Sequence, residues 1–117
     1  MHEFEFKKNN TLKERQDKAL RVLNKYTDRV PVICERAPDS KIAQMDRSKI
    51  LVPKDLSVAQ FIKVIRKRIK LKPEETIYLF INDKLVSTSS LMSQVYHTNK
   101  DKDGFLYVSY SAENYFG

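Results

Sequence analysis

The residue with the most suggestive chemistry is the last one, Gly117. A glycine has no Cβ, so a narrow active site can grip and activate its free carboxylate. If residues 105–110 form a core strand, residues 111–117 become a short exposed tail that carries this carboxylate away from the fold. That arrangement suits a protein that is joined to another molecule through its end. Taken alone, the residue favours the plainer interpretation that a chain ends on glycine by chance, so the rest of the chain must decide.

The other reactive side chains do not form a catalytic or metal-binding pattern. Cys34 lies in an apolar segment with no histidine near it in sequence, which is typical of a buried cysteine that acts as a small hydrophobe. His2 and His97 lack metal-ligand spacing, and Asp101 and Asp103 resemble a calcium loop only faintly because no closing glutamate follows. Two glycines cannot build a phosphate-cradling loop. We therefore expect no enzyme, no metal and no cofactor.

Composition indicates one basic globular domain. The 117 residues include 22 Lys+Arg against 15 Asp+Glu, a net charge of +7. This charge favours acidic lipid, acidic peptides, tubulin-like surfaces or nucleic acid without choosing among them. The aromatic residues fall in core-like patterns, so no nucleic-acid partner is expected. The sequence has no apolar run of about 18 residues and no signal-peptide layout. The single cysteine fits a reducing, cytoplasmic compartment.

The N-terminal quarter predicts an amphipathic helix that must lie on a surface. Thr11 and Glu14 form a capping-box pattern at its start, and the helix is expected to end near Asp28. Val22 flanks its apolar stripe, whose members recur on one side. They are Leu12, Ala19, Leu23 and Tyr26.

Two strands are predicted next, over residues 30–36 and 49–53, as an antiparallel pair. Pro31 has no amide proton, so that part of the first strand should lie at an edge or at its start. Both strands carry apolar residues at alternate positions on each side. A sheet of this kind needs cover on both faces.

The remaining chain completes an α+β, ubiquitin-like β-grasp pattern. Ser57 and Gln60 open a strongly periodic helix, with Val58, Phe61, Ile62, Ile65 and Ile69 on one face. A strand over residues 77–81, a turn, a minor strand at 85–86, a helix around 90–97 and a strand over 105–110 follow. We expect one domain, 1–117, with a four-stranded mixed sheet and a central helix. It divides into additional N-terminal helices (1–28), the β-grasp core (29–110) and the exposed tail (111–117).

Several blocks in register carry a family resemblance. They are residues 26–38, 46–53, 60–61, 65–68 and 105–110, with Phe116 and Gly117 at the end. Over essentially the whole chain the sequence resembles the GABARAP family of autophagy ubiquitin-like modifiers. The resemblance implies a non-enzymatic modifier. Ubiquitin-activating-like and conjugating-like enzymes would join its Gly117 carboxylate as an amide to phosphatidylethanolamine.

Localisation and partners follow from the same resemblance. The protein would be cytoplasmic when free and on autophagosome and cytoplasmic vesicle membranes when lipidated, where two acyl chains anchor it. Its binding partners would be autophagy receptors and adaptors with short linear motifs, and tubulin remains a candidate. The rival interpretation is a ubiquitin-like adaptor in cytoskeletal or vesicle trafficking that is never conjugated.

The resemblance also implies that extended aromatic-x-x-aliphatic peptides add a strand to the edge formed by residues 49–52. The pocket for the aromatic anchor, called the aromatic pocket below, would consist of Lys18, Val22, Pro31, Ile33, Lys49, Leu51 and Phe105. The pocket for the aliphatic anchor, called the aliphatic pocket, would consist of Ile50, Val52, Pro53, Leu56, Phe61, Val64 and Arg68. Arg29 and Arg47 would meet acidic residues that flank the peptide core. Each pocket residue is also compatible with an ordinary place in the core, and Lys49 with protection of a sheet edge.

Four departures from the family pattern put partner preference in doubt. Lys18 stands where the family often has an acidic residue, and Ile50 replaces a common aromatic. Thr27 and the pair at 86–87 replace prolines. These changes leave the expected fold intact and indicate a divergent paralogue.

Overall fold

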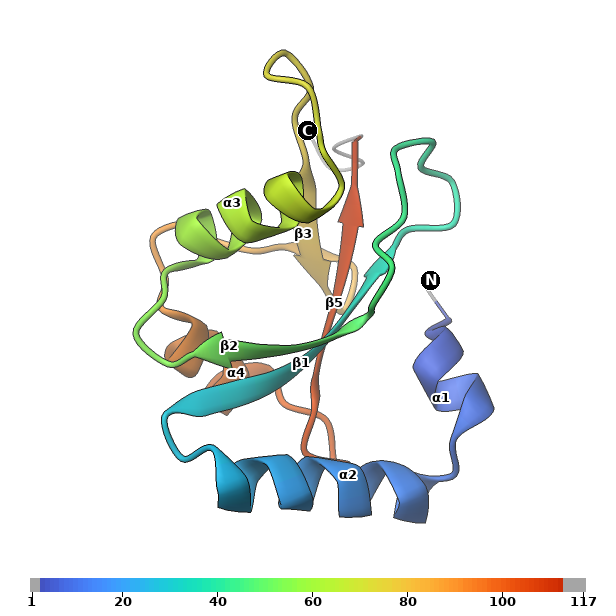
Figure 1. The fold of residues 1–117 in the computed structure, drawn as a ribbon, viewed down its shortest axis with the longest axis vertical. Coiled ribbons are helices and arrows are strands. Elements are labelled where there is room, and N and C mark those ends of the chain that lie inside the picture. The colour runs from blue at the N-terminus through green and yellow to red at the C-terminus, as the bar shows by residue number, and fades with distance from the viewer. Residues whose placement is uncertain (1–2, 113–117) are drawn as a thin grey trace.

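A five-stranded mixed sheet forms the centre of the structure, a computed structural model that describes residues 3–112 (Figure 1). The strand order is β2-β1-β5-β3-β4. The strands are β1 (Arg29–Arg36), β2 (Lys49–Pro53), β3 (Tyr78–Ile81), β4 (Lys84–Leu85) and β5 (Leu106–Ser111). The helices are α1 (Glu5–Asn9), α2 (Leu12–Lys25), α3 (Val58–Arg68) and α4 (Met92–Asn99). The predicted α+β fold is confirmed, and the minor strand predicted at 85–86 appears as the two-residue β4, which joins the expected four-stranded sheet as a fifth strand.

The two middle strands, β1 and β5, run parallel, and every other pair in the sheet is antiparallel. Pairing of β1 with β5 begins at Val32, opposite Leu106. Pro31 precedes this pairing and lies opposite Leu51 of β2. A missing amide proton therefore removes no bond to β5, as expected for a proline near the start of a strand.

Helix α3 covers one face of the sheet. Ser57 Oγ accepts a hydrogen bond from Gln60 N at 3.1 Å, and Gln60 Oε1 accepts one from Ser57 N at 2.9 Å, which confirms the predicted capping box. Phe61 and Ile65, both fully buried, join Val52 in the main hydrophobic core. The apolar stripe read from the sequence is thus the buried face of this helix.

Helix α2 covers the opposite face, so β1 and β2 run between α2 and α3 (Figure 1). Its capping box of Thr11 and Glu14 is also present, but the helix ends at Lys25, before the predicted end. Ala19 of α2 packs with Ile33 and Phe105 in a second hydrophobic cluster. The second cover that the two-sided strands required is therefore this helix.

The last strand ends later than expected. Strand β5 continues through Ser111, which is fully buried, and Ala112 N donates a hydrogen bond to Ser40 Oγ at 3.2 Å. The first two residues of the predicted tail thus belong to the folded domain. Its remainder, Gly117 included, lies outside the described residues. Within residues 3–112 no helix combines the length and the apolar character needed to cross a membrane.

Gly104 lies in the loop before β5, where its backbone packs closely against α2. Its φ is +96°, and a Cβ at this position would lie 2.9 Å from the Ala19 Cβ. We predict that Gly104→Ala lowers the free energy of unfolding by about 2 kcal/mol or more, because backbone strain adds to the clash. Urea unfolding would measure the change, with Lys102→Ala in the same loop as control. Equal midpoints for the two variants would contradict this account.

Candidate functional site

Strand β2 is an edge strand of the sheet formed by the described residues. Cys34 N donates to Ser48 O at 2.8 Å, which places residues 48, 50 and 52 as the hydrogen-bonded partners of β1. Because bonded and non-bonded pairs alternate in an antiparallel ladder, Lys49 and Leu51 direct their backbone N–H and C=O groups away from β1. This edge, β2 residues 49–52, can accept another strand.

The residues predicted for the aromatic pocket are brought together on the α2 face. Lys49 lies opposite Ile33 and Leu51 lies opposite Pro31, so these four side chains share one side of the sheet. Phe105 packs with Ile33 in the second cluster. Lys18 and Val22, one turn apart on α2, complete the set and are half-buried.

The floor of this pocket is closed in the structure. Ile33 and Phe105 are 0% exposed. Ala19 covers them from α2, and the Phe6 ring meets the Phe105 ring edge-on at 5.1 Å between centroids. An aromatic side chain can reach these two residues only if the side chains above them move. The sequence prediction missed Phe6 and Ala19 as parts of the pocket, although Phe4 and Phe6 stand out in a charged N-terminal segment.

The residues predicted for the aliphatic pocket lie on the other face, between β2 and α3. Ile50, Val52 and Phe61 are buried in the main core, and Leu56 packs against that core. The parts that reach the surface are half-buried or exposed. They are Pro53, Leu56, Val64 and Arg68.

Arg29 and Arg47 lie near opposite ends of the edge. Arg29 opens β1 opposite Pro53, and Arg47 comes two residues before Lys49. Both side chains are exposed, and neither forms an ion pair within residues 3–112. They are therefore available to acidic groups that flank a bound strand.

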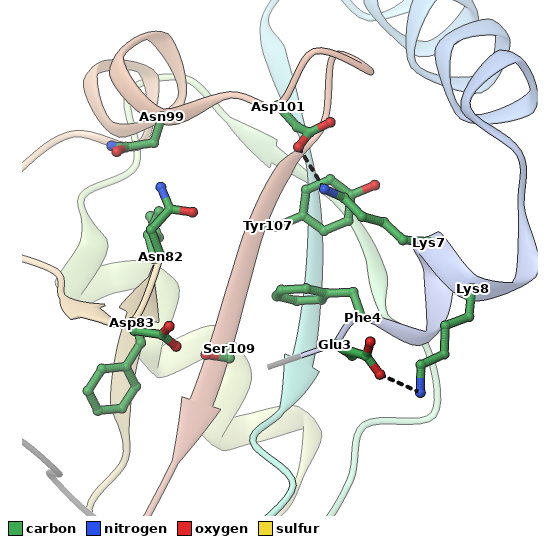
Figure 2. A pocket seen from close by; sticks show the side chains of 12 residues that line it. Glu3, Phe4, Lys7, Lys8, Asn82, Asp83, Asn99, Asp101, Tyr107 and Ser109 are labelled. Carbon is green, nitrogen blue, oxygen red and sulfur yellow. Dashed lines mark hydrogen bonds and ion pairs between the residues drawn. The ribbon is translucent and has the colours of Figure 1, made fainter. Parts of the chain in front are cut away.

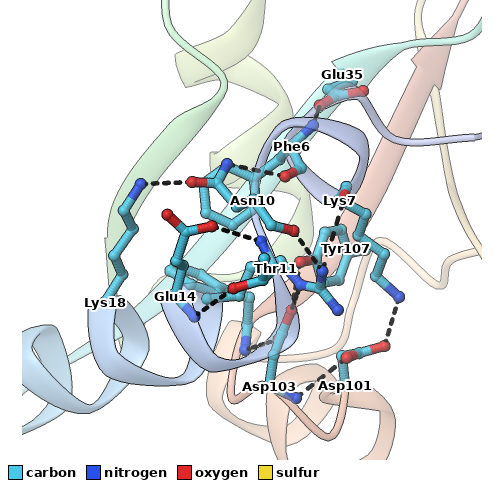
Figure 3. Close-up of polar contacts among 12 residues, drawn as sticks. Phe6, Lys7, Asn10, Thr11, Glu14, Lys18, Glu35, Asp101, Asp103 and Tyr107 are labelled. Atoms are coloured by element: carbon cyan, nitrogen blue, oxygen red, sulfur yellow. Dashed lines mark hydrogen bonds and ion pairs between the residues drawn. The ribbon is translucent and has the colours of Figure 1, made fainter.

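The N-terminal segment is fixed to the sheet by polar contacts (Figure 3). The Glu35 carboxylate accepts hydrogen bonds from Glu5 N at 2.9 Å and Phe6 N at 3.1 Å, both in α1. Lys7 Nζ lies 2.7 Å from Asp101 Oδ1. Burial alone would raise the pKa of Asp101, but the hydrogen bond from Lys7 and nearby positive charge outweigh it and lower this pKa. Helix α1 thus holds Phe6 against the floor of the aromatic pocket.

A buried ion pair connects α2 to the loop before β5. Arg15 Nε donates to Asp103 Oδ2 at 2.9 Å, and the Asp103 side chain is 0% exposed. The same carboxylate accepts from Phe105 N at 2.8 Å and from the Tyr107 hydroxyl. Burial, followed by the bond to Asp103, raises the pKa of Tyr107. The acidic pair that faintly resembled a calcium loop is therefore used internally, and residues 3–112 contain no group of three or more side chains suited to hold a metal.

A cavity of about 460 Å³ lies between α1 and the β3–β4 turn, apart from the predicted pockets. Its lining includes Phe4 and Tyr107, and Figure 2 shows Lys7 paired with Asp101 and Lys8 paired with Glu3 at its border. Both of these cations are already paired, and the other charged lining residue, Asp83, is acidic, so the cavity offers no unpaired cation of the described residues to an anionic ligand. The sequence prediction did not identify it.

Cys34 is 1% exposed, and burial raises the pKa of its thiol. A thiol that stays protonated is a poor nucleophile, so Cys34 is not suited to catalysis. The residue packs in the core, as predicted. His97 is exposed on α4, and His2 lies outside the described residues.

Comparisons with known proteins agree with this geometry. A family model described as "Autophagy protein Atg8 ubiquitin like" matches residues 14–117. Autophagy-related protein 8 of Candida glabrata is 54% identical over 112 residues, which cover 96% of this chain and 95% of that protein. Autophagy-related protein 8B of Oryza sativa subsp. indica is also 54% identical over 112 residues, covering 96% of this chain and 94% of that protein.

A solved structure gives the same result at the level of the fold. The crystal structure of Trypanosoma brucei ATG8 superposes with a TM-score of 0.93 at 41% sequence identity. The match covers 99% of this chain and 100% of that chain. Sequence and architecture therefore point to one group of proteins.

Proposed function

Because the chain belongs to the Atg8 family of ubiquitin-like autophagy proteins, we propose that it acts through two sites: its C-terminal carboxylate and the β2 edge. The resemblance read from the sequence is confirmed, and the chain is an autophagy ubiquitin-like modifier. The finer proposal is that Gly117 is conjugated to phosphatidylethanolamine. The β2 edge then binds extended aromatic-x-x-aliphatic motifs of autophagy receptors and adaptors.

The observation that supports peptide binding is the β2 edge, which within residues 3–112 pairs only with β1 and lies between the two predicted sets of pocket residues. Lys49 and Leu51 offer backbone groups for a ladder with an added strand. Side chains three residues apart in a strand point to opposite faces. An aromatic anchor would therefore meet the α2 face, while an aliphatic anchor three residues later would meet the α3 face. The residues predicted for the two pockets lie on these two faces.

Conjugation is supported by the family and by the terminal glycine, which lies outside the described residues. A chain without a membrane-spanning helix in residues 3–112 would gain stable anchoring from the two acyl chains of a lipid. Its partners would be ubiquitin-activating-like and conjugating-like enzymes and, after conjugation, the membranes of autophagosomes and cytoplasmic vesicles.

The second candidate is a ubiquitin-like adaptor that is never conjugated. Helix α3 favours it, because Lys63, Lys67 and Arg68 are exposed and form no ion pair among the described residues. Such a basic surface attracts acidic partners, tubulin among them. Basic residues near the C-terminus of a helix also stabilise the helix by interacting with the negative end of its dipole. The basic surface therefore does not by itself identify a partner.

Leu51→Ala is the direct test of the peptide site. The half-buried Leu51 lies on the β2 edge at the aromatic pocket. We expect its truncation to weaken an aromatic-x-x-leucine peptide about tenfold by calorimetry, because an apolar contact at the centre of the interface is lost. Leu20→Ala is the matched control, since Leu20 is 58% exposed on α2. Equal affinities for these two variants, with circular dichroism unchanged, would count against the site.

Phe61, which also belongs to the predicted aliphatic pocket, is a poorer choice for this test. It is 0% exposed in the main core. Truncating a buried phenylalanine typically costs about 3–5 kcal/mol of stability, so a loss of binding would not distinguish the pocket from the fold.

A further inference from the structure

We propose that Lys18 makes the aromatic pocket prefer a tyrosine anchor to a tryptophan anchor, an inference that rests on the peptide binding proposed above. Lys18 Nζ donates a hydrogen bond to Asn10 Oδ1 at 2.7 Å and lies 5.6 Å from the centroid of the Phe6 ring (Figure 3). The Phe6 ring packs against Phe105 in the floor of the pocket. A cation therefore stands beside the rings that an incoming anchor would meet.

The Glu14 carboxylate lies near this cation but is engaged elsewhere, since hydrogen bonds with Thr11 and, less strongly, the Lys18 charge lower the pKa of Glu14. Glu14, one turn earlier on α2, uses its Oε1 to accept from Thr11 N at 2.7 Å and so completes the capping box. Within residues 3–112 Lys18 forms no ion pair. An ammonium has three donors and no acceptor. Lys18 therefore retains donors for a group that enters the pocket.

The opposite wall of the pocket also provides a hydrogen-bond donor, the ammonium group of Lys49. Lys49 is exposed on β2 and lies opposite Ile33, on the face that α2 covers. Its side chain forms no ion pair within the described residues. The polar edge of an anchor ring thus meets ammonium groups from α2 and from β2, and neither can accept a hydrogen bond.

This arrangement distinguishes the three aromatic anchors by their chemistry. A tyrosine hydroxyl accepts a hydrogen bond from an ammonium, whereas a tryptophan indole N–H only donates. Leaving that N–H unpaired at a partly buried site is costly. An indole would gain more from a cation–π contact, but the Lys18 ammonium already lies over the Phe6 ring. Phenylalanine, which neither donates nor accepts, should fall between the other two.

Calorimetry with three peptides tests the inference. The peptides are identical aromatic-x-x-leucine sequences with Tyr, Phe or Trp as the anchor, titrated into the full chain. We expect the tyrosine peptide to bind about tenfold more tightly than the tryptophan peptide. Lys18→Glu replaces donors by an acceptor and should reverse this order. Lys18→Met removes one of the two ammonium donors without adding an acceptor, so the preference for tyrosine over phenylalanine should shrink, with Lys49 as the remaining donor.

Lys13→Glu is the matched control, because Lys13 is on the same helix, 87% exposed, and 3.9 Å from its partner Asp17. It changes the net charge by the same amount and should leave the order of the peptides unchanged. Thermal unfolding shows whether each variant stays folded, since Lys18 also contacts Asn10. If Lys18→Glu does not fold, Lys18→Met decides the question alone.

Two results distinguish a failure of this inference from a failure of the proposed peptide binding. If all three peptides bind and wild type prefers tryptophan, or Lys18→Glu and Lys18→Met keep the wild-type ratios of affinity among the peptides, the inference is overturned while peptide binding stands. If none of the three peptides binds wild type, peptide binding itself fails and the inference fails with it.

Discussion

Gly117→Ala is expected to reduce ATP-dependent conjugation to phosphatidylethanolamine by about 100-fold or more. A methyl group at the last residue widens the chain where an activating enzyme must hold its carboxylate in line for reaction. Small misplacements of a reacting group cost about 100-fold in rate. Glycine is also able to adopt backbone conformations that alanine cannot. Gly117 lies outside the described residues 3–112, so thermal unfolding of the variant is measured alongside to show that stability is unchanged.

The measurement combines a gel-mobility shift with pelleting on phosphatidylethanolamine liposomes, in the presence of the activating and conjugating enzymes and ATP. Wild type without ATP gives the baseline, and Leu20→Ala shows that an exposed substitution on α2 leaves conjugation intact. If wild type and Gly117→Ala behave alike, conjugation through this residue is wrong. The non-conjugated adaptor then becomes the better proposal.

The elements of the fold could be predicted because their signals are local. Two capping boxes, at Thr11 and Ser57, start α2 and α3, and both are formed as expected. The apolar alternation in residues 30–36 predicted a strand covered on both faces, and α2 and α3 supply that cover. Such patterns depend on neighbours within one or two turns, so they can be read without knowing how the elements pack.

The contacts that close the aromatic pocket could not be predicted in the same way. Phe6 and Phe105 meet across nearly the whole length of the chain, and Glu35 binds the backbone of α1 from β1. A helix as short as α1 has little stability of its own, so it forms because tertiary contacts hold it. Alternating aromatic and charged residues gave no helical periodicity there. The position of Phe6 therefore became visible only in the structure.

The closed floor also changes how the peptide site is understood. Family resemblance placed Ile33 and Phe105 in a pocket, and the structure places them under Phe6 and Ala19 with no exposed surface. In the proposed peptide complex an anchor would compete with side chains of the protein's own N-terminal helices. Affinity would therefore depend on how firmly α1 and α2 are held, as well as on contacts with the peptide.

The firmest of these attachments is the buried pair of Arg15 and Asp103, and Asp103→Ala should lower the free energy of unfolding by about 3–5 kcal/mol. The substitution leaves a buried guanidinium without its counter-ion. It also removes the acceptor for Phe105 N and for the Tyr107 hydroxyl. A native domain is stable by only about 5–15 kcal/mol, so this loss is a large share.

The chain offers a matched control two residues away. Asp101 is also an aspartate in an ion pair, with Lys7, but the two side chains are 22% and 40% exposed. Breaking a pair of this kind typically costs at most about 1 kcal/mol, so Asp101→Ala should shift the urea midpoint far less. Because the two variants differ in burial rather than in residue type, comparable losses would show that the Asp103 site is not the attachment described here.

Removing both partners sharpens the result. In Asp103→Ala with Arg15→Leu no charge is left buried and unpaired, so we expect the double variant to be more stable than Asp103→Ala alone. Recovery of stability in the double variant would show that Asp103→Ala is destabilising because it leaves the Arg15 guanidinium buried without a counter-ion. Without recovery, the loss would instead reflect the hydrogen bonds that Asp103 accepts from the start of β5. Recovery would therefore identify the Arg15–Asp103 pair as the contact through which the loop before β5 holds α2 over the pocket floor.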